Sequence, residues 1–378
     1  MTEHHGSGPV RPVPHHPADD LARHLFQDLP RADQRRWATA YLRGLCSTPG
    51  KKSVRNMAWT VSTSDTAWQS LHQIVNASTW RWEPVRRRLA DWCVRQLPPR
   101  ALVPAPVLIP KRGQHSVGVH RRFDPGSGRT LGCQWAFGLF LATEYGTTPL
   151  DWRLHLPGRW SEDARLRTRV CVPESERSRA PHDLTLDLLD HPGAPEVPVL
   201  ATAAHHTGVQ PLLAALTARG HGFALRVPAT TPVTIGLLRP TRHVRGPQPT
   251  GALPARQFLQ RLGRAATAPL GPAASHLRLA PAMVRVPGSP RPLQPVATWP
   301  PDGGPRHIWL TDLPAGRLAA LADLLTVPFT PAADSLVDHG LHDFEGRSYP
   351  GWHRHMTLVS AAHAHHVRTA AAAWQQAA

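Results

Sequence analysis

The stretch 101-ALVPAPVLIPKRGQHSVGV-119 decides the fold, because it predicts a hydrophobic strand that runs into a basic, glycine-containing turn. Pro104 and Pro106 interrupt that strand. Proline removes a donor from the hydrogen-bond ladder of a sheet, so it is normally found at an edge or a boundary. The two prolines therefore raise the question of what this strand is built to do.

Helical periodicity precedes this strand. Residues 1–19, rich in His and Pro, are expected to be a disordered tail, because they can bury little apolar surface. Apolar residues at helical spacing then predict four short helices, within 30–46, 51–61, 66–75 and 83–97, which together form a helical domain over 20–98. We interpret the tryptophans of this domain as core residues rather than base-stacking platforms: Trp59, Trp68, Trp80, Trp82 and Trp92.

Alternation of strands and helices follows the opening strand. Strands are predicted within 115–123, 131–146, 149–157, 197–206 and 221–227, and helices within 161–172, 182–191 and 208–220. Sixteen of the 41 prolines fall in 228–305, which predicts a β-rich or loop-rich insertion. A further strand, a helix and a histidine-bearing helix close the chain. The pattern is that of an α/β fold, a mixed sheet flanked by helices.

Charge narrows the range of partners. The chain carries 43 Lys and Arg against 26 Asp and Glu, a formal net charge of +17. Residues 21–100 alone hold 14 Lys and Arg against 5 Asp and Glu. Such a balance attracts polyanions, of which nucleic acid is the commonest in a soluble chain. A GC-rich genome would also explain the many arginines, so charge alone leaves nucleic-acid binding open.

Cysteine usage and hydropathy exclude several classes of protein. Cys46, Cys93, Cys133 and Cys171 lie far apart without a CxxC pair, which favours neither a zinc ribbon nor a disulfide framework. The sequence has no apolar run of about 18 residues and no signal-peptide pattern. We therefore expect a cytoplasmic protein with no membrane partner.

Several blocks, in order, carry a family resemblance. They are KRGQHSVGVHRRF (111–123), DWRLHLPGRW (151–160), IWLTDLP (308–314) and GLHDFEGRSYPGWHRHMTLVSAAHA (340–364), with YLRGL (41–45) before them. Together they resemble the insertion-sequence DDE transposases of the 701-like group, whose catalytic domain is a DDE superfamily endonuclease. The resemblance implies an RNase H-like fold over 99–227 and 306–378, an insertion subdomain over 228–305, and DNA binding by the helical domain 20–98.

The resemblance also implies a catalytic site, and this sequence departs from it. Family members cut and join DNA with two Asp and one Glu that hold two Mg²⁺ ions, because hard carboxylates clamp such ions. Alignment places Ala105 and Pro106 at the first Asp, Thr202 at the second and Phe329 at the Glu. No catalytic residue and no Mg²⁺ cofactor is therefore expected. A displaced acid remains open for the third position, where the nearest are Asp334, Asp338 and Glu345.

Two interpretations concern side chains near those blocks. Glu345 lies in a well-matched block, but pairing with Arg347 or capping of a helix is favoured over catalysis, because the family acid lies upstream. A histidine group in the last helix is interpreted as lining a groove rather than holding a metal, because His353 and His355, two residues apart, do not share one helical face; the other pairings stay open. Its members are His353, His355, His363, His365 and His366.

Double-stranded DNA is the expected partner. Positive charge at a helix N-terminus, at the turn after the first strand, and in the 340–364 block matches phosphate contacts. The predicted contacts are Lys51, Lys52, Arg55, Lys111, Arg112, His115, Arg121, Arg122, Arg347 and His353. We expect an inactive, nucleoid-associated DNA-binding relative of these transposases, with a homodimer left open. The alternatives are an active enzyme with displaced acids and a protein-interaction scaffold.

Overall fold

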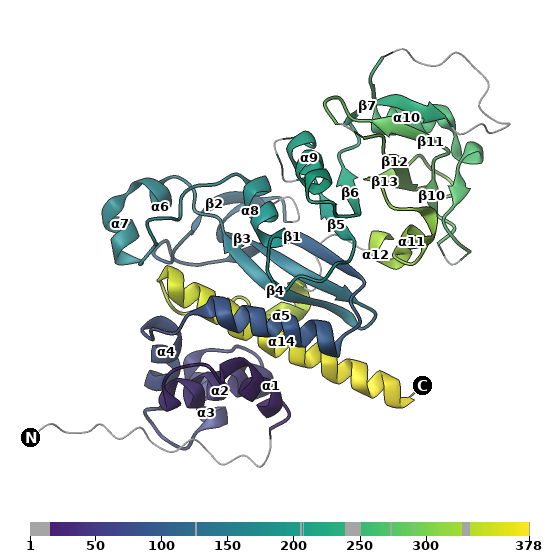
Figure 1. Cartoon of the computed structure of the whole chain (residues 1–378). Coiled ribbons are helices and arrows are strands. Elements are labelled where there is room, and N and C mark those ends of the chain that lie inside the picture. The colour runs from purple at the N-terminus through teal and green to yellow at the C-terminus, as the bar shows by residue number, and fades with distance from the viewer. Residues whose placement is uncertain are drawn as a thin grey trace, which may run out of the picture.

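The computed structural model describes residues 16–124, 127–204, 206, 208–238, 251–272, 274–289, 291–326 and 333–377. Within the described residues, no helix is long and apolar enough to cross a membrane. The predicted fold class, a mixed sheet flanked by helices and preceded by a helical segment, is confirmed (Figure 1). Phe329 lies outside the described residues.

Five helices precede the sheet, one more than predicted. They are α1 (Asp19–Phe26), α2 (Ala32–Ser47), α3 (Val54–Val61), α4 (Ala67–Asn76) and α5 (Trp82–Gln96). On α3 the buried residues are Val54, Met57, Ala58 and Val61, the apolar face that the spacing predicts. The interpretation of the tryptophans as core residues is correct for Trp80, which is buried, and wrong for Trp59, which is 77% exposed.

The large sheet has ten strands in the order β2-β3-β1-β5-β6-β13-β12-β10-β9, with β4 also paired to β3. Its first strands are β1 (Ala101–Pro110), β2 (His120–Asp124), β3 (Arg129–Thr143), β4 (Gly146–Leu154), β5 (Val199–Thr202) and β6 (Phe223–Val227). β1 is antiparallel to β3 and parallel to β5, and β5 is parallel to β6. The carboxyl ends of β1, β5 and β6 therefore meet at one edge of the sheet.

The Pro-rich segment 228–305 is β-rich, as predicted, but it is not wholly separate from the large sheet. A small sheet is formed by β7 (Pro232–Leu238), β8 (Leu253–Pro254) and β11 (Ala282–Arg285). The strands β9 (Ala268–Pro269), β10 (Leu277–Leu279) and β12 (Gln294–Thr298) instead extend the large sheet beyond β13 (Arg306–Thr311). Part of the segment thus continues the main fold.

The remaining helices are short, apart from the last. They are α6 (Arg159–Glu162), α7 (Ala164–Arg169), α8 (Pro181–Leu189), α9 (Gln210–Ala218), α10 (Ala255–Leu262), α11 (Ala315–Ala319), α12 (Ala322–Thr326), α13 (Ala333–Asp338) and α14 (Tyr349–Ala377). Every residue of α14 from 351 to 364 is buried. The interpretation that its histidines line a groove is therefore wrong for His353, His355 and His363, which belong to the core.

α14 joins the helical segment to the sheet. It packs against α2, α4 and α5 on one side and against β4 on the other (Figure 1). The Arg354 guanidinium donates to the carbonyl oxygens of Val75 and Trp80, each at 3.0 Å, and the Trp152 indole N–H donates to Ser360 Oγ at 2.8 Å. One continuous hydrophobic core runs from Ala18 to Ala364 through this helix.

Candidate functional site

Ala105 and Pro106, which the alignment places at the first Asp of the family, lie where the sheet opens between β1 and β5. Within the described residues, Leu102 is the one β1 residue with a partner in β5, and its N–H points to that side. Strand alternation turns positions 104 and 106 the same way, and both are prolines without an N–H. β1 meanwhile stays paired with β3 over its whole length. The prolines therefore cost no bond to β3 and end the β1–β5 ladder just before Ala105.

Ala105, Thr202 and Arg226 fall in one row across the sheet. The β5–β6 register pairs Thr202 with Arg226, and the single β1–β5 pair, three residues earlier, sets Ala105 opposite Thr202. Residues in one row point to the same face of a sheet. Ala105 and Thr202 are buried and Arg226 is half-buried. The row therefore offers a methyl group, a hydroxyl group and a guanidinium.

Arg226 is held in place by its neighbour on β13. Its Nη2 donates to Nδ1 of His307, and its carbonyl oxygen accepts the Ala203 N–H at 2.8 Å. Burial lowers the pKa of His307, and the charges of Arg226 and Arg306 lower it further. The imidazole is therefore neutral near pH 7 and accepts from the guanidinium, which keeps its charge. A fixed cation thus lies on β6 in the row of Thr202, held by a contact with β13.

These residues do not fit a pair of Mg²⁺ ions. Magnesium in proteins is held by carboxylate oxygens, and this row has none. Within the part of the chain that the structure describes, no three His, Cys, Asp or Glu side chains gather closely enough to hold a metal ion. Among the residues that the structure does not describe, Glu3 is the only Asp or Glu in the sequence. The segment 327–332, which contains Phe329, has neither residue type.

Comparison with protein families gives one match. The model of the DDE superfamily endonuclease matches residues 24–283, more than half of the chain. The chain belongs to this family. The predicted resemblance is therefore confirmed at the level of the DDE family, and the match runs from α1 through the row to β11. No curated protein matches the chain.

In this DDE family member, the block 340–348 contacts the start of α3. Asp343 Oδ2 accepts the Lys52 N–H at 2.8 Å, and Glu345 Oε2 accepts the Val54 N–H at 3.4 Å. The Ser53 side chain accepts the Asn56 N–H at 3.2 Å. Carboxylates of the chain itself therefore occupy two of the N–H groups at the helix start that was predicted to bind a DNA phosphate, and Glu345 acts as a helix cap.

Lys111 and Lys52 point inward, contrary to the prediction that they contact DNA. Lys111 Nζ donates to the carbonyl oxygens of His342 at 3.3 Å and Phe344 at 3.1 Å. Burial lowers the pKa of Lys111 to about 8. Lys52 is buried, and its Nζ donates to the Thr48 carbonyl. Both ammonium groups therefore serve contacts within the chain.

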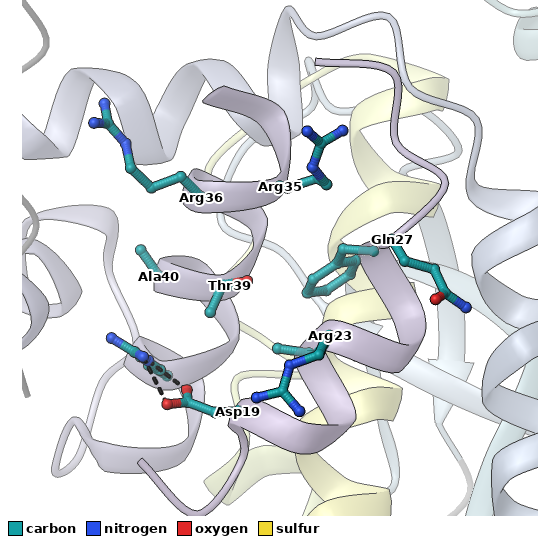
Figure 2. A pocket seen from close by; sticks show the side chains of 10 residues that line it. Asp19, Arg23, Gln27, Arg35, Arg36, Thr39 and Ala40 are labelled. Carbon is teal, nitrogen blue, oxygen red and sulfur yellow. Dashed lines mark hydrogen bonds and ion pairs between the residues drawn. The ribbon is translucent and has the colours of Figure 1, made fainter. Parts of the chain in front are cut away.

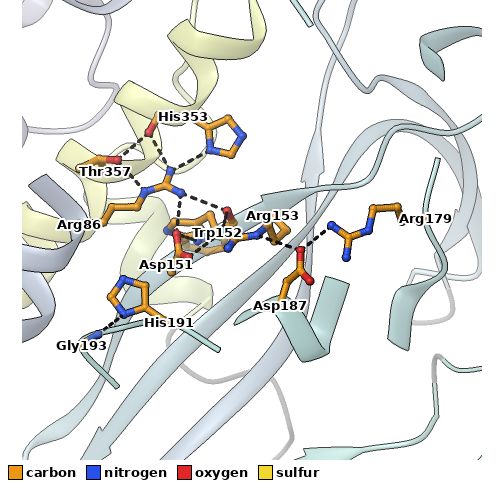
Figure 3. Close-up of polar contacts among 10 residues, drawn as sticks. All are labelled: Arg86, Asp151, Trp152, Arg153, Arg179, Asp187, His191, Gly193, His353 and Thr357. Carbon is orange, nitrogen blue, oxygen red and sulfur yellow. Dashed lines mark hydrogen bonds and ion pairs between the residues drawn. The ribbon is translucent and has the colours of Figure 1, made fainter. Parts of the chain in front are cut away.

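His353 is also withdrawn from the surface, in a buried polar network (Figure 3). The Arg86 guanidinium donates to Asp151 Oδ1 at 2.7 Å, to Thr357 Oγ1 at 2.8 Å and to the His353 carbonyl at 2.9 Å. The His353 ring stacks on Trp82 at 4.7 Å. These contacts leave His353 no access to DNA, and they explain the well-matched 151–160 block as a structural element.

The other predicted contacts remain at the surface around α3, around the turn and hairpin, and at Arg347. Exposed side chains are Lys51 and Arg55 around α3, Arg112, His115 and Arg121 around the turn and hairpin, and Arg347. Arg122 is half-buried, with its guanidinium 3.5 Å from the Trp135 ring centroid. Residues 111–129 hold five Lys and Arg against one Asp. The turn and hairpin therefore form a basic surface close in sequence to the carboxyl end of β1.

Trp59, interpreted from the sequence as a core residue, lies at the surface. It follows Arg55 by one helical turn on α3, and Arg55 lies over the Trp68 ring at 5.0 Å. The signal was present, because the apolar face defined by Val54, Met57 and Val61 excludes both residues from the core. α3 thus presents a basic and aromatic outer face.

Proposed function

We propose that this chain is an inactive member of the 701-like insertion-sequence transposases that binds duplex DNA without cutting it. The row of Ala105, Thr202 and Arg226 carries this proposal. DNA binding would serve competition with an active transposase or regulation of transposition, and would associate the protein with the nucleoid.

The row argues against two-metal chemistry on electrostatic grounds. Two Mg²⁺ ions bring four positive charges, which three carboxylates partly neutralise in a DDE site. Here the strand of Arg226 lies one strand spacing, about 4.8 Å, from the strand of Thr202, and the Arg226 guanidinium in this row adds positive charge that disfavours such ions. Loss of one principal catalytic group typically costs about 10⁴ to 10⁶ in rate. The site lacks two such groups in the described residues.

DNA binding is supported by charge that catalysis would not need. The net charge is +17, and the exposed cations Arg112 and Arg121 lie on the basic turn and hairpin. Arginine presents a planar fork that matches a phosphate. Phosphate contacts release counterions from DNA, so each contact adds to the salt dependence of binding.

A duplex-binding titration in EDTA tests the proposal. We expect binding at about 50 mM salt, with log Kd linear in log salt. The double variant Arg112→Glu/Arg121→Glu should flatten the slope by about 1.8, since each lost phosphate contact removes about 0.9. Arg256→Glu/Arg317→Glu, which reverses two exposed cations on α10 and α11, is the control matched for charge. Absence of binding by the wild-type chain at low salt would refute the proposal.

One observation favours the alternative of an active enzyme with displaced acids. Asp343 and Glu345 both act on Lys111 electrostatically, so two carboxylates lie near the turn that follows β1. Incubation of supercoiled plasmid with Mg²⁺ or Mn²⁺ separates the two functions. Nicking that Glu345→Ala abolishes would establish the enzyme, whereas intact plasmid is expected if the site is inert.

A further inference from the structure

A groove between α1 and α2 gathers arginines that the sequence analysis did not single out (Figure 2). Arg35 and Arg36 lie at one end of it and Asp19 at the other, with Thr39 and Ala40 between them. The groove is lined by Asp19, Ala22, Arg23, Phe26, Gln27, Arg35, Arg36, Thr39, Ala40 and Arg43. The lining thus has four guanidinium groups and one carboxylate.

Ion pairing inside the groove is incomplete. Arg43 is neutralised by Asp19, whose two carboxylate oxygens accept from its Nε at 2.7 Å and its Nη2 at 2.8 Å. Arg23 has an exposed pair with Asp20 at 3.0 Å, which water screens. Arg35 donates to the Leu29 carbonyl, an uncharged partner. The groove therefore keeps excess positive charge at the end where Arg35 and Arg36 lie.

Arg36 has buried donors that lack an acceptor. Its Nε and Nη2 atoms are buried and, among the residues that the structure describes, have no hydrogen-bond partner. Its guanidinium lies 5.2 Å from the Trp37 ring centroid, a contact that satisfies none of its N–H groups. Buried N–H groups are almost always paired in folded proteins, and a charged group without a partner is the costliest exception. An anionic acceptor from outside the chain would remove this cost.

We propose that the α1–α2 groove binds a backbone phosphate of DNA, with Arg36 donating to it and Arg23 and Arg35 flanking it. This inference rests on the proposed DNA-binding function and names a contact for it. A guanidinium fork suits phosphate oxygens. The single aromatic residue of the lining, Phe26, is buried, so no ring face is open to a base. The contact is therefore expected to be independent of DNA sequence.

The test compares Arg36→Gln with Arg317→Gln in the full-length chain. Arg36→Gln should weaken duplex binding about tenfold at about 100 mM salt and reduce the salt slope by about 0.9. Its melting temperature should stay the same or rise, because the unpaired donors are removed. Arg317→Gln should change neither property. A structural role of Arg36 would instead lower the melting temperature and leave the salt slope unchanged.

The outcomes separate this inference from the proposed function. If wild-type protein binds no duplex, the proposed function fails. If the wild type binds and Arg36→Gln binds equally well, the function stands and the groove inference is wrong. Inorganic phosphate and a poly-glutamate peptide are titrated alongside the duplex. One result would overturn the inference: phosphate or poly-glutamate stabilises the wild type but not Arg36→Gln, while Arg36→Gln keeps full affinity for DNA. The groove would then belong to a free anion or an acidic protein.

Discussion

Arg86 is the residue on which three separate parts of the chain depend. It lies on α5, and its guanidinium contacts Asp151 of β4 and Thr357 of α14 (Figure 3). Burial alone would raise the pKa of Asp151, but Arg86 and Arg153 hold that pKa below its usual value. The pair therefore stays charged in the core, where each charge needs the other.

Removal of one partner should be costly. We expect Asp151→Asn to lower the free energy of unfolding by about 3–5 kcal/mol, because it leaves a buried guanidinium without its counterion. Asp91→Asn, on the exposed side of α5, should change it by less than about 0.5 kcal/mol. Urea denaturation measures both. Equal stability of the two variants would show that the network does not hold the elements together.

The sequence could not predict this role. Three consecutive arginines, Arg86-Arg87-Arg88, fan over most of a helix, so the sequence leaves open which of them is solvated; Arg87 is exposed. Arg86 is 2% exposed, and the counterion that stabilises it there, Asp151 on β4, lies 65 residues away in the sequence. Periodicity assigns Arg86 to a helix, but it says nothing about a partner that only the tertiary fold supplies.

At the scale of elements, α14 buries histidines in neutral form. The His355 Nε2–H donates to the Gly340 carbonyl at 2.9 Å, which leaves Nδ1 to accept from the Tyr41 hydroxyl at 3.0 Å. Burial lowers the pKa of His355 and of His363 to about 3 each. Burial and the neighbouring arginines lower the pKa of His353 as well.

These histidines predict acid sensitivity. Below about pH 6.5 the unfolded chain takes up protons on them and the folded chain does not, so stability falls as pH drops toward the folded pKa of about 3. Each should cost about 1.4 kcal/mol at about pH 5.5. Urea denaturation at about pH 7.5 and 5.5 measures the change. Between these values the free energy of unfolding of His363→Gln should fall by about 1.4 kcal/mol less than that of the wild type. The exposed neighbour variant His366→Gln should behave like wild type, and the same loss in both variants would contradict this assignment.

Most helices and strands could be predicted from the sequence pattern, because β3, β4 and β6 are nearly continuous buried runs and α9 has buried leucines at helical spacing. β2 is shorter than predicted, beginning at His120 after a turn. α14 was predicted as a helix, but its polar residues suggested a surface groove. They are buried because they are paired with distant carbonyl, hydroxyl and guanidinium groups, which no local pattern reveals.

At the scale of the molecule, one fold carries both a basic surface and a row of residues without carboxylates. The sequence alone located Ala105 and Thr202, through resemblance. Arg226 beside them emerged only from strand register, which depends on how β5 and β6 pair. The exposed charges around α3, the hairpin and the α1–α2 groove remain where DNA could reach them. The fold has the mixed sheet expected of a DDE domain, with a guanidinium on β6 in the row of Ala105 and Thr202.

The most direct test is Mn²⁺ binding by the purified chain without DNA, measured by electron paramagnetic resonance of the free ion. The absence of a carboxylate cluster at the row predicts that adding the protein to about 100 μM Mn²⁺ leaves the concentration of free ion unchanged, because carboxylates are the ligands that hold such ions. Tight binding of one or two ions per chain, lost in Glu345→Ala, would contradict the account and establish a displaced metal site.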